Sequence, residues 1–127
     1  MTVVSERLLK VLGFGSRFWN TWRQEHTDVP IVFDGGDLSG MILTGIDFSR
    51  ASFRGARLHA TNLMNADLRS ADFTDADLTE ADLIGAKLQS AVLTGAKLKE
   101  ADLLGADLTD AVYTASDLAG ALHVPEQ

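Results

Sequence analysis

The sequence of 127 residues predicts an all-β solenoid preceded by a helical segment, and three observations indicate this fold class. An apolar residue returns at every fifth position from Phe33 to Leu118 without one insertion. Two places before it the residue is mostly small, with Ala at thirteen of the nineteen positions from Ile31 to Ala121. Residues 1–29 instead space their apolar side chains four apart, which is typical of a helix. A strict internal repeat takes precedence over other local signals when a fold is predicted.

The five-residue period fits neither a continuous helix nor a continuous strand. On an α-helix five residues advance a side chain by roughly 140° net, so the apolar positions would spiral around every face. In a strand an odd spacing would place successive apolar residues on opposite faces. We therefore expect each pentapeptide to be a short extended segment followed by a turn.

Each repeat then has positions with distinct roles. The small residue and the apolar residue, which we call the centre, face inward, and the outward position between them faces water. The next two residues are the first and second turn positions. Gly occupies the second turn position in eight of the eighteen repeats. Because Gly adopts the backbone angles that tight turns require, its placement supports this assignment.

Runs such as ADLRSADFTDADLTEADL resemble the pentapeptide-repeat protein family, and the resemblance covers about residues 31–122. It implies a right-handed quadrilateral β-helix in which four pentapeptides make one coil, so the eighteen repeats form about four and a half coils. Residues twenty apart do share their character in this sequence. One column of centres is mostly aromatic: Phe33, Phe53, Phe73, Leu93 and Tyr113.

The outward positions beside the next column alternate in charge. At a coil spacing of about 4.8 Å, such opposite charges would attract one another between coils. We therefore expect these side chains to hold the coils together: Asp37, Arg57, Asp77, Lys97 and Asp117.

We expect residues 1–30 to form an α-helical N-terminal cap on the first coil, with a break near Gly13-Phe14-Gly15. A solenoid needs caps because its terminal coils otherwise expose apolar core and unpaired backbone. The side chains expected to contact the first coil are Phe14, Phe18, Trp19 and Trp22.

Two further interactions are considered for the ends. Residues 1–29 combine Trp and Leu with basic side chains, which is also the composition of a membrane-surface helix, but three acidic residues dilute the basic face and make membrane binding the less favoured interpretation. Residues 123–127 are expected to be a short tail. An incompletely covered final coil could pack against a second copy, which predicts an end-to-end homodimer.

The composition argues against several function classes. The chain has no Cys, so thiolate metal sites and Cys nucleophiles are excluded. The three His residues have no metal-ligand spacing, and no catalytic or phosphate-binding motif is present. We expect no enzyme activity, metal or cofactor. Residues 30–127 hold seven basic and fifteen acidic side chains, which argues against direct nucleic-acid binding. The N-terminal residues resemble neither a signal peptide nor a membrane span, so we expect a cytoplasmic protein.

These observations favour a non-catalytic scaffold that binds another protein, of unknown identity, through a rigid solenoid face. Contiguous apolar side chains on a polar surface often mark contacts. We number the four faces of a coil in chain order, beginning with the repeat centred on Phe33. The third face has such a stripe at its first turn positions, with one residue beside it: Ile42, Met64, Ile84 and Leu104.

An alternative comes from the resemblance, because some family members inhibit or protect DNA gyrase by imitating duplex DNA. The acidic body has about one charge per 2.7 Å, against one per ~1.7 Å in the duplex. A rod of about 22 Å is short for that role, and basic side chains interrupt its acidic surface.

Overall fold

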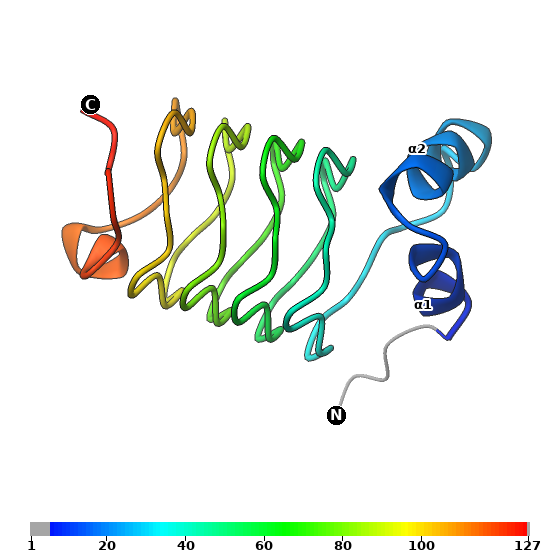
Figure 1. The fold of residues 1–127 in the computed structure, drawn as a ribbon, viewed down its shortest axis with the longest axis horizontal. Coiled ribbons are helices and arrows are strands. Elements are labelled where there is room, and N and C mark those ends of the chain that lie inside the picture. Colours follow the sequence, from blue (N-terminus) through cyan, green and yellow to red (C-terminus); the bar gives the residue numbers. More distant parts are fainter. Residues whose placement is uncertain (1–5, 127) are drawn as a thin grey trace.

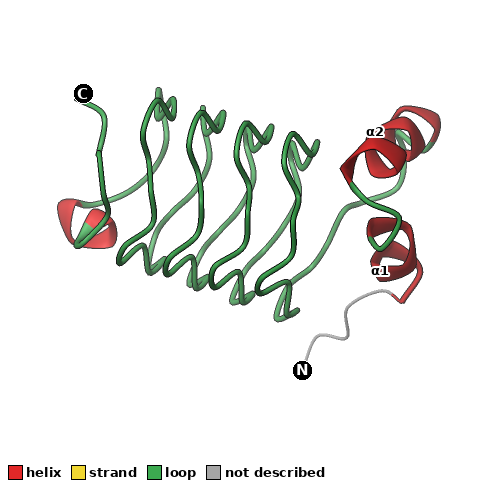
Figure 2. Cartoon of the chain, in the orientation of Figure 1, coloured by secondary structure: helices red, strands yellow, loops and turns green. Residues whose placement is uncertain are grey.

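The computed structural model describes residues 6–126 and shows a solenoid with two helices at one end (Figure 1). Helix α1 spans Glu6–Leu12 and helix α2 spans Ser16–Glu25, and the break between them lies at the predicted Gly13-Phe14-Gly15. The 3-10 helix η1, Ala115–Leu118, lies in the last coil. Within the described residues the extended parts are single β-bridges rather than longer strands, so Figure 2 draws the coils as loops.

The coils stack with a register of twenty residues, as the sequence predicts. Parallel bridges join Val32 to Ser52, Asp37 to Arg57, Ile42 to Asn62 and Asp47 to Asp67, one on each of four faces. On the first face, the Ser52 N–H donates to the Ile31 carbonyl and the Phe33 N–H to the Ser52 carbonyl, both at 2.8 Å. This pairing recurs from coil to coil and satisfies the backbone of each short extended segment.

A tight turn follows each centre. The Gly36 N–H donates to the Phe33 carbonyl at 2.8 Å, and the equivalent bond recurs along the chain. The second turn position has a positive φ whether it is Gly, as at Gly35 (69°), or another residue, as at Asn65 (57°). Only Gly adopts this conformation without steric cost, which explains its recurrence there. Ala115 departs from the pattern because η1 begins at this residue.

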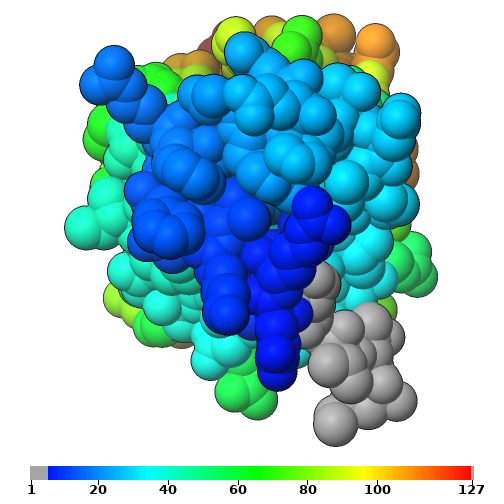
Figure 3. Space-filling view, turned by 90° about the vertical axis from the view of Figure 1, so that its right-hand side faces the viewer, coloured from blue at the N-terminus to red at the C-terminus, as the bar shows by residue number. Residues whose placement is uncertain are grey.

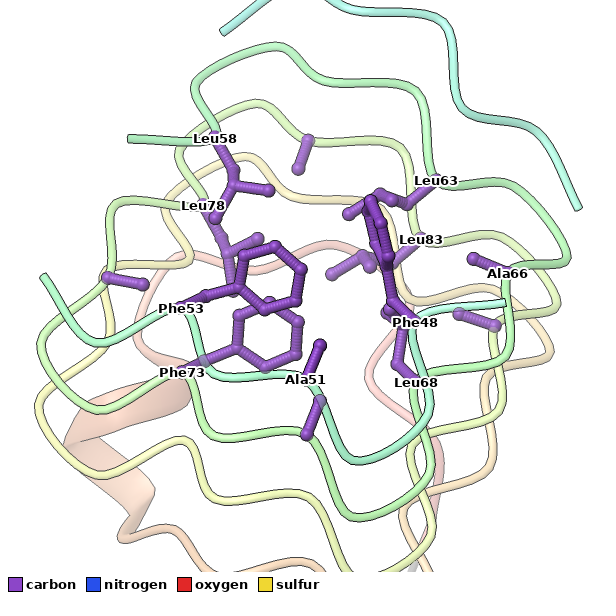
Figure 4. Packing of buried hydrophobic residues seen from close by; sticks show 14 of the residues in the cluster. Phe48, Ala51, Phe53, Leu58, Leu63, Ala66, Leu68, Phe73, Leu78 and Leu83 are labelled. Carbon is purple, nitrogen blue, oxygen red and sulfur yellow. The ribbon is translucent and has the colours of Figure 1, made fainter. Parts of the chain in front are cut away.

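The centres form the core. Every one from Phe33 to Leu108 is at most 2% exposed, and nearly all the small residues are buried with them. Figure 4 shows Phe53 stacked on Phe73 and Leu63 on Leu83 in adjacent coils. The Phe53 and Phe73 ring centroids are 5.0 Å apart with an interplanar angle of 6°. Stacking at coil spacing therefore produces one continuous apolar column inside the rod.

Helices α1 and α2 cover the end of the first coil (Figure 3). Leu8, Leu12, Trp19 and Trp22 are buried in the same cluster as the solenoid core. The Trp19 ring lies 5.8 Å from that of Phe33 and 5.4 Å from that of Phe48.

Polar contacts fix α2 on this end. The Trp19 Nε1–H donates to the Asp47 carbonyl at 2.8 Å, and the Arg23 guanidinium donates to the Ser49 carbonyl at 2.8 Å. No helix in residues 6–126 is long and apolar enough to cross a bilayer.

The prediction that Phe14 and Phe18 contact the first coil is wrong. Phe14 is 70% exposed and Phe18 is 50% exposed, whereas Trp19 is completely buried. Phe14 lies outside both helices, in the turn between them, and Phe18 precedes Trp19 by one residue, about 100° around α2. The inner contacts from α1 come from Leu8 and Leu12 instead.

Candidate functional site

The third face contains the predicted partner-binding stripe. Parallel bridges join its outward positions in the order Ile42, Asn62, Asp82, Asp102 and Leu122. Beside this column run the first turn positions Thr44, Met64, Ile84 and Leu104. The structure therefore brings Ile42, Met64, Ile84 and Leu104 onto one face.

The apolar side chains of this face differ in exposure. Ile42 is 76% exposed and Leu104 is 51% exposed, at opposite ends of the stripe. Met64 and Ile84, between them, are half-buried. Leu122 is 45% exposed and extends the stripe by one coil. It was missed as a site residue, although its position twenty residues after Asp102 already placed it on this face.

The polar residues of the third face are used by its own turns. Asn62 and Asp82 accept hydrogen bonds from the backbone N–H groups of Met64 and Ile84 at 3.0 Å, and Asp102 accepts one from Leu104 at 3.1 Å. Hydrogen bonds from His123 and from the Leu104 N–H lower the pKa of Asp102. These bonds fix the turns that project the apolar side chains.

The same use of carboxylates corrects the predicted charge ladder. Among the described residues, no ion pair within 4.0 Å joins two members of the column from Asp37 to Asp117. Asp77 instead accepts the Thr79 N–H at 2.9 Å, and hydrogen bonds from Thr79 lower the Asp77 pKa. Lys97 contributes a smaller lowering across the coil spacing. Most Asp side chains at the outward positions therefore accept hydrogen bonds within their own turns.

The outer side of the helices carries a second exposed apolar surface. The Phe14 and Phe18 ring centroids are 4.8 Å apart. These two side chains and Leu9, all exposed, are named here the N-terminal apolar face. Beside them a hollow of about 440 Å³ is lined by Glu6, Arg7, Lys10, Val11, Phe14, Phe18 and Trp22. The guanidinium of Arg7 lies 5.8 Å above the Trp22 ring, so a cation borders this hollow.

Residues 6–126 contain no group of three or more His, Asp or Glu side chains that could hold a metal ion. The closest paired groups are His123 with Asp102, at 3.0 Å, and His59 with Glu80, at 3.2 Å. Each is a single exposed pair, which provides too few oxygen ligands for a hard cation.

The register, the turns and the core together define a class of protein, the pentapeptide-repeat solenoids. The family model for pentapeptide repeats matches residues 33–69 and 76–112, with eight copies. The chain belongs to this family. No curated protein matches it.

Solved structures of the same class resemble the chain. A pentapeptide-repeat protein from the thylakoid lumen of Arabidopsis thaliana is 32% identical, with a TM-score of 0.65 over 76% of this chain. The chain spans 64% of the length of that protein. The Nostoc protein alr5209 is 35% identical, with a TM-score of 0.46 over 80% of this chain and 92% of its own. QnrB1, a plasmid-mediated fluoroquinolone resistance protein, is 19% identical with a TM-score of 0.35 over 73% of this chain and 72% of its own, a likeness too low to inform function.

Proposed function

We propose that this protein is a non-catalytic scaffold that binds another protein through the third face of its solenoid. The observation that carries the proposal is the stripe itself, in which Ile42 and Leu104 are 76% and 51% exposed, whereas every centre from Phe33 to Leu108 is at most 2% exposed. The N-terminal helices leave Ile42 uncovered. Contiguous exposed apolar residues on a polar surface are typical of contact sites.

The third face is suited to present these side chains rigidly. Inter-coil backbone bonds fix the turns at Gly45, Asn65 and Gly85, as when the Gly45 N–H donates to the Met64 carbonyl at 2.8 Å. The turns that carry Met64, Ile84 and Leu104 are also fixed by the amide or carboxylate two residues before. Little conformational entropy remains to be lost when a partner binds, which favours affinity. We assign the scaffold a cytoplasmic location and the helices the role of its N-terminal cap as parts of the same proposal.

Affinity capture from the host cell tests the proposal, with the double variant Ile42→Ser/Leu104→Ser against the matched variant Phe14→Ser/Phe18→Ser. We expect a protein captured by the wild type and by the second variant to be lost with the first, and the purified pair to bind directly. Loss of the two most exposed apolar side chains of the stripe should weaken that binding at least about tenfold. A partner retained by Ile42→Ser/Leu104→Ser would refute the third-face proposal.

Imitation of DNA at gyrase remains the alternative proposal and has less support from the geometry. A mimic needs regularly spaced acid along one face. Here each of the two most acidic outward columns contains basic residues, as at Arg57 and Lys97 or Lys87. A supercoiling assay decides the matter: inhibition or protection of gyrase by the purified protein would support mimicry, and the absence of both would exclude it.

A further inference from the structure

The N-terminal apolar face is unused by the fold. Phe14 is the most exposed aromatic residue at the helical end, and it lies in the turn between α1 and α2, where it projects from the rod rather than into it. Phe18 packs against its ring, and Leu9 is also exposed. Another side of α2 already packs on the first coil through Trp19, whose ring lies against Phe33 and Phe48. Phe14 and Phe18 are therefore exposed side chains outside the apolar cluster that Trp19 shares with the solenoid core.

The charge of this end differs in sign from that of the rod. Residues 6–29 hold four basic and three acidic side chains, a net charge of +1. The cations Arg7 and Lys10 line the hollow with Phe14 and Phe18, and Arg17 is exposed next to Phe18 in the sequence. Residues 30–127 hold seven basic and fifteen acidic side chains. Since α1 and α2 lie at one end of the rod (Figure 1), the charge of the molecule changes from weakly positive at that end to negative along the coils.

We propose that the N-terminal apolar face docks on an anionic phospholipid surface, with the solenoid standing end-on above it. Phe14 and Phe18 enter the boundary between headgroups and acyl chains, and Lys10 and Arg17 lie among the lipid phosphates. Aromatic and basic side chains on one side of short helices are the chemistry that such surfaces bind.

The charge arrangement also selects the orientation. An acidic rod lying flat would face an anionic surface with its carboxylates and be repelled. In the end-on orientation the coils extend to about 20 Å from the tip, beyond the Debye length of about 8 Å at physiological salt. The third face then points sideways and stays free for a protein partner, so the two proposals are independent.

Vesicle co-sedimentation of the full chain tests the inference. The probes are vesicles of phosphatidylcholine with about 30% phosphatidylglycerol and vesicles of phosphatidylcholine alone, at about 0.05 and 0.5 M salt. We expect sedimentation with the anionic vesicles at low salt and a marked decrease at high salt. Equal binding to both lipid compositions would overturn the proposal.

Matched variants locate the binding surface. Phe14→Ser/Phe18→Ser should lower the vesicle affinity at least about tenfold, because two exposed aromatic side chains no longer leave water on docking. Lys10→Gln/Arg17→Gln should lower it by roughly tenfold at low salt. Both pairs are exposed, so unchanged thermal midpoints should accompany these losses.

The control variant is Ile42→Ser/Leu104→Ser, which changes the third face and should bind vesicles like the wild type. Anionic-vesicle binding that survives Phe14→Ser/Phe18→Ser would overturn the proposal. A wild-type chain that stays in the supernatant with anionic vesicles would also overturn it. A protein segment would then be the expected occupant of the N-terminal apolar face. Failure at this face would not affect capture through the third face, so the two proposals fail separately.

Discussion

The two ends of the solenoid place equivalent residues in different surroundings. Phe33 begins the aromatic column of centres and is fully buried, because the Trp19 ring from α2 lies 5.8 Å away. Tyr113 ends the same column and is only half-buried. Leu38 and Leu118, the first and last members of the neighbouring column, differ in the same way. A centre is therefore buried by the layers on both sides of its coil and not by the coil alone.

The polar groups of the two ends are also satisfied by different means. At the N-terminal end, side chains of α2 take the place of a preceding coil, as when Asn20 accepts the Asp47 N–H at 2.7 Å and donates to the Gly45 carbonyl at 3.0 Å. At the other end the last coil folds back on itself in η1. Asp117 there accepts the Thr114 N–H at 2.8 Å and the Gly95 N–H at 3.1 Å. One end is closed by a separate apolar layer, the other by local hydrogen bonds.

Trp19→Ala should have the largest effect on this difference. The side chain is fully buried against Trp22, Phe33 and Phe48, and its removal opens a cavity at the first coil. We expect the free energy of unfolding to fall by about 3–5 kcal/mol in urea titrations. Tyr113→Ala, at the half-covered end, should cost less than half of that. Equal costs for the two variants would show that the ends are energetically alike.

Arg23→Ala should have the next largest effect. The guanidinium donates to the Ser49 carbonyl at 2.8 Å and to the Asp47 carbonyl at 3.1 Å in a partly buried contact. Its loss removes the side-chain donor of the Ser49 carbonyl, whereas the Asp47 carbonyl keeps the Trp19 Nε1–H, and we expect a cost of about 1–3 kcal/mol. Arg17→Ala, an exposed residue on the same helix, is the control and should change the free energy of unfolding by less than about 0.5 kcal/mol. A comparable loss for Arg17→Ala would contradict the role given to Arg23.

The repeat could be predicted from the sequence because the residue type at each inward position follows directly from its burial. The centre and the small residue two before it are specified by burial alone. The register of twenty came from the resemblance to the pentapeptide-repeat family, and the bridges between residues twenty apart confirm it. The N-terminal side chains could not be assigned as fully. The four-residue spacing of Phe14, Phe18 and Trp22 suggested one helical face, but Phe14 lies beyond the end of α1, so the spacing carries no helical meaning there.

The acidic residues show another limit of sequence reasoning. A column of alternating charge such as Asp77 beneath Lys97 looks like pairing between coils. The carboxylate of Asp77 has a nearer donor, the backbone N–H of Thr79 two residues later. Local bonds of this kind form within one turn and order no long side chain, so they prevail over exposed ion pairs. A sequence pattern with period five shows that Asp recurs but not which neighbour it binds.

Acidification should destabilise the C-terminal end of the rod before the N-terminal end. Hydrogen bonds lower the pKa of Asp102, from His123 and Leu104, of Asp107, from Thr109, and of Asp117, from Thr114 and Gly95. Because these pKa values are lowered in the folded state, the stabilisation is present above the ordinary carboxyl pKa of about 4 and is lost as the pH falls through the lowered values. Earlier coils carry such carboxylates too, but each of those coils is held between two neighbours.

We therefore expect the last coils to open first below about pH 4. Amide hydrogen exchange should report faster opening around residues 100–120 at a pH where the fluorescence of Trp19 and Trp22 is still that of the folded protein. At neutral pH, by contrast, the C-terminal coils and the Trp19 and Trp22 region should unfold together at one thermal midpoint. Simultaneous loss of both signals on acidification would contradict the difference between the ends.

The smallest expected effect on stability comes from Val112→Asp, which tests end-to-end dimerisation. Val112, Leu122 and Val124 are exposed at the C-terminal side of the rod, and we propose that a second copy covers them. A carboxylate near the existing Asp110 would repel its symmetry mate in an isologous contact.

The matched control is Val32→Asp, at the equivalent outward position of the first coil. Sedimentation velocity should show a dimer for the wild type and for Val32→Asp and a monomer for Val112→Asp, with the free energy of unfolding of each monomer changed by less than about 0.5 kcal/mol. A monomeric wild type would refute the dimer, and dissociation by Val32→Asp would place the contact at the helical end instead.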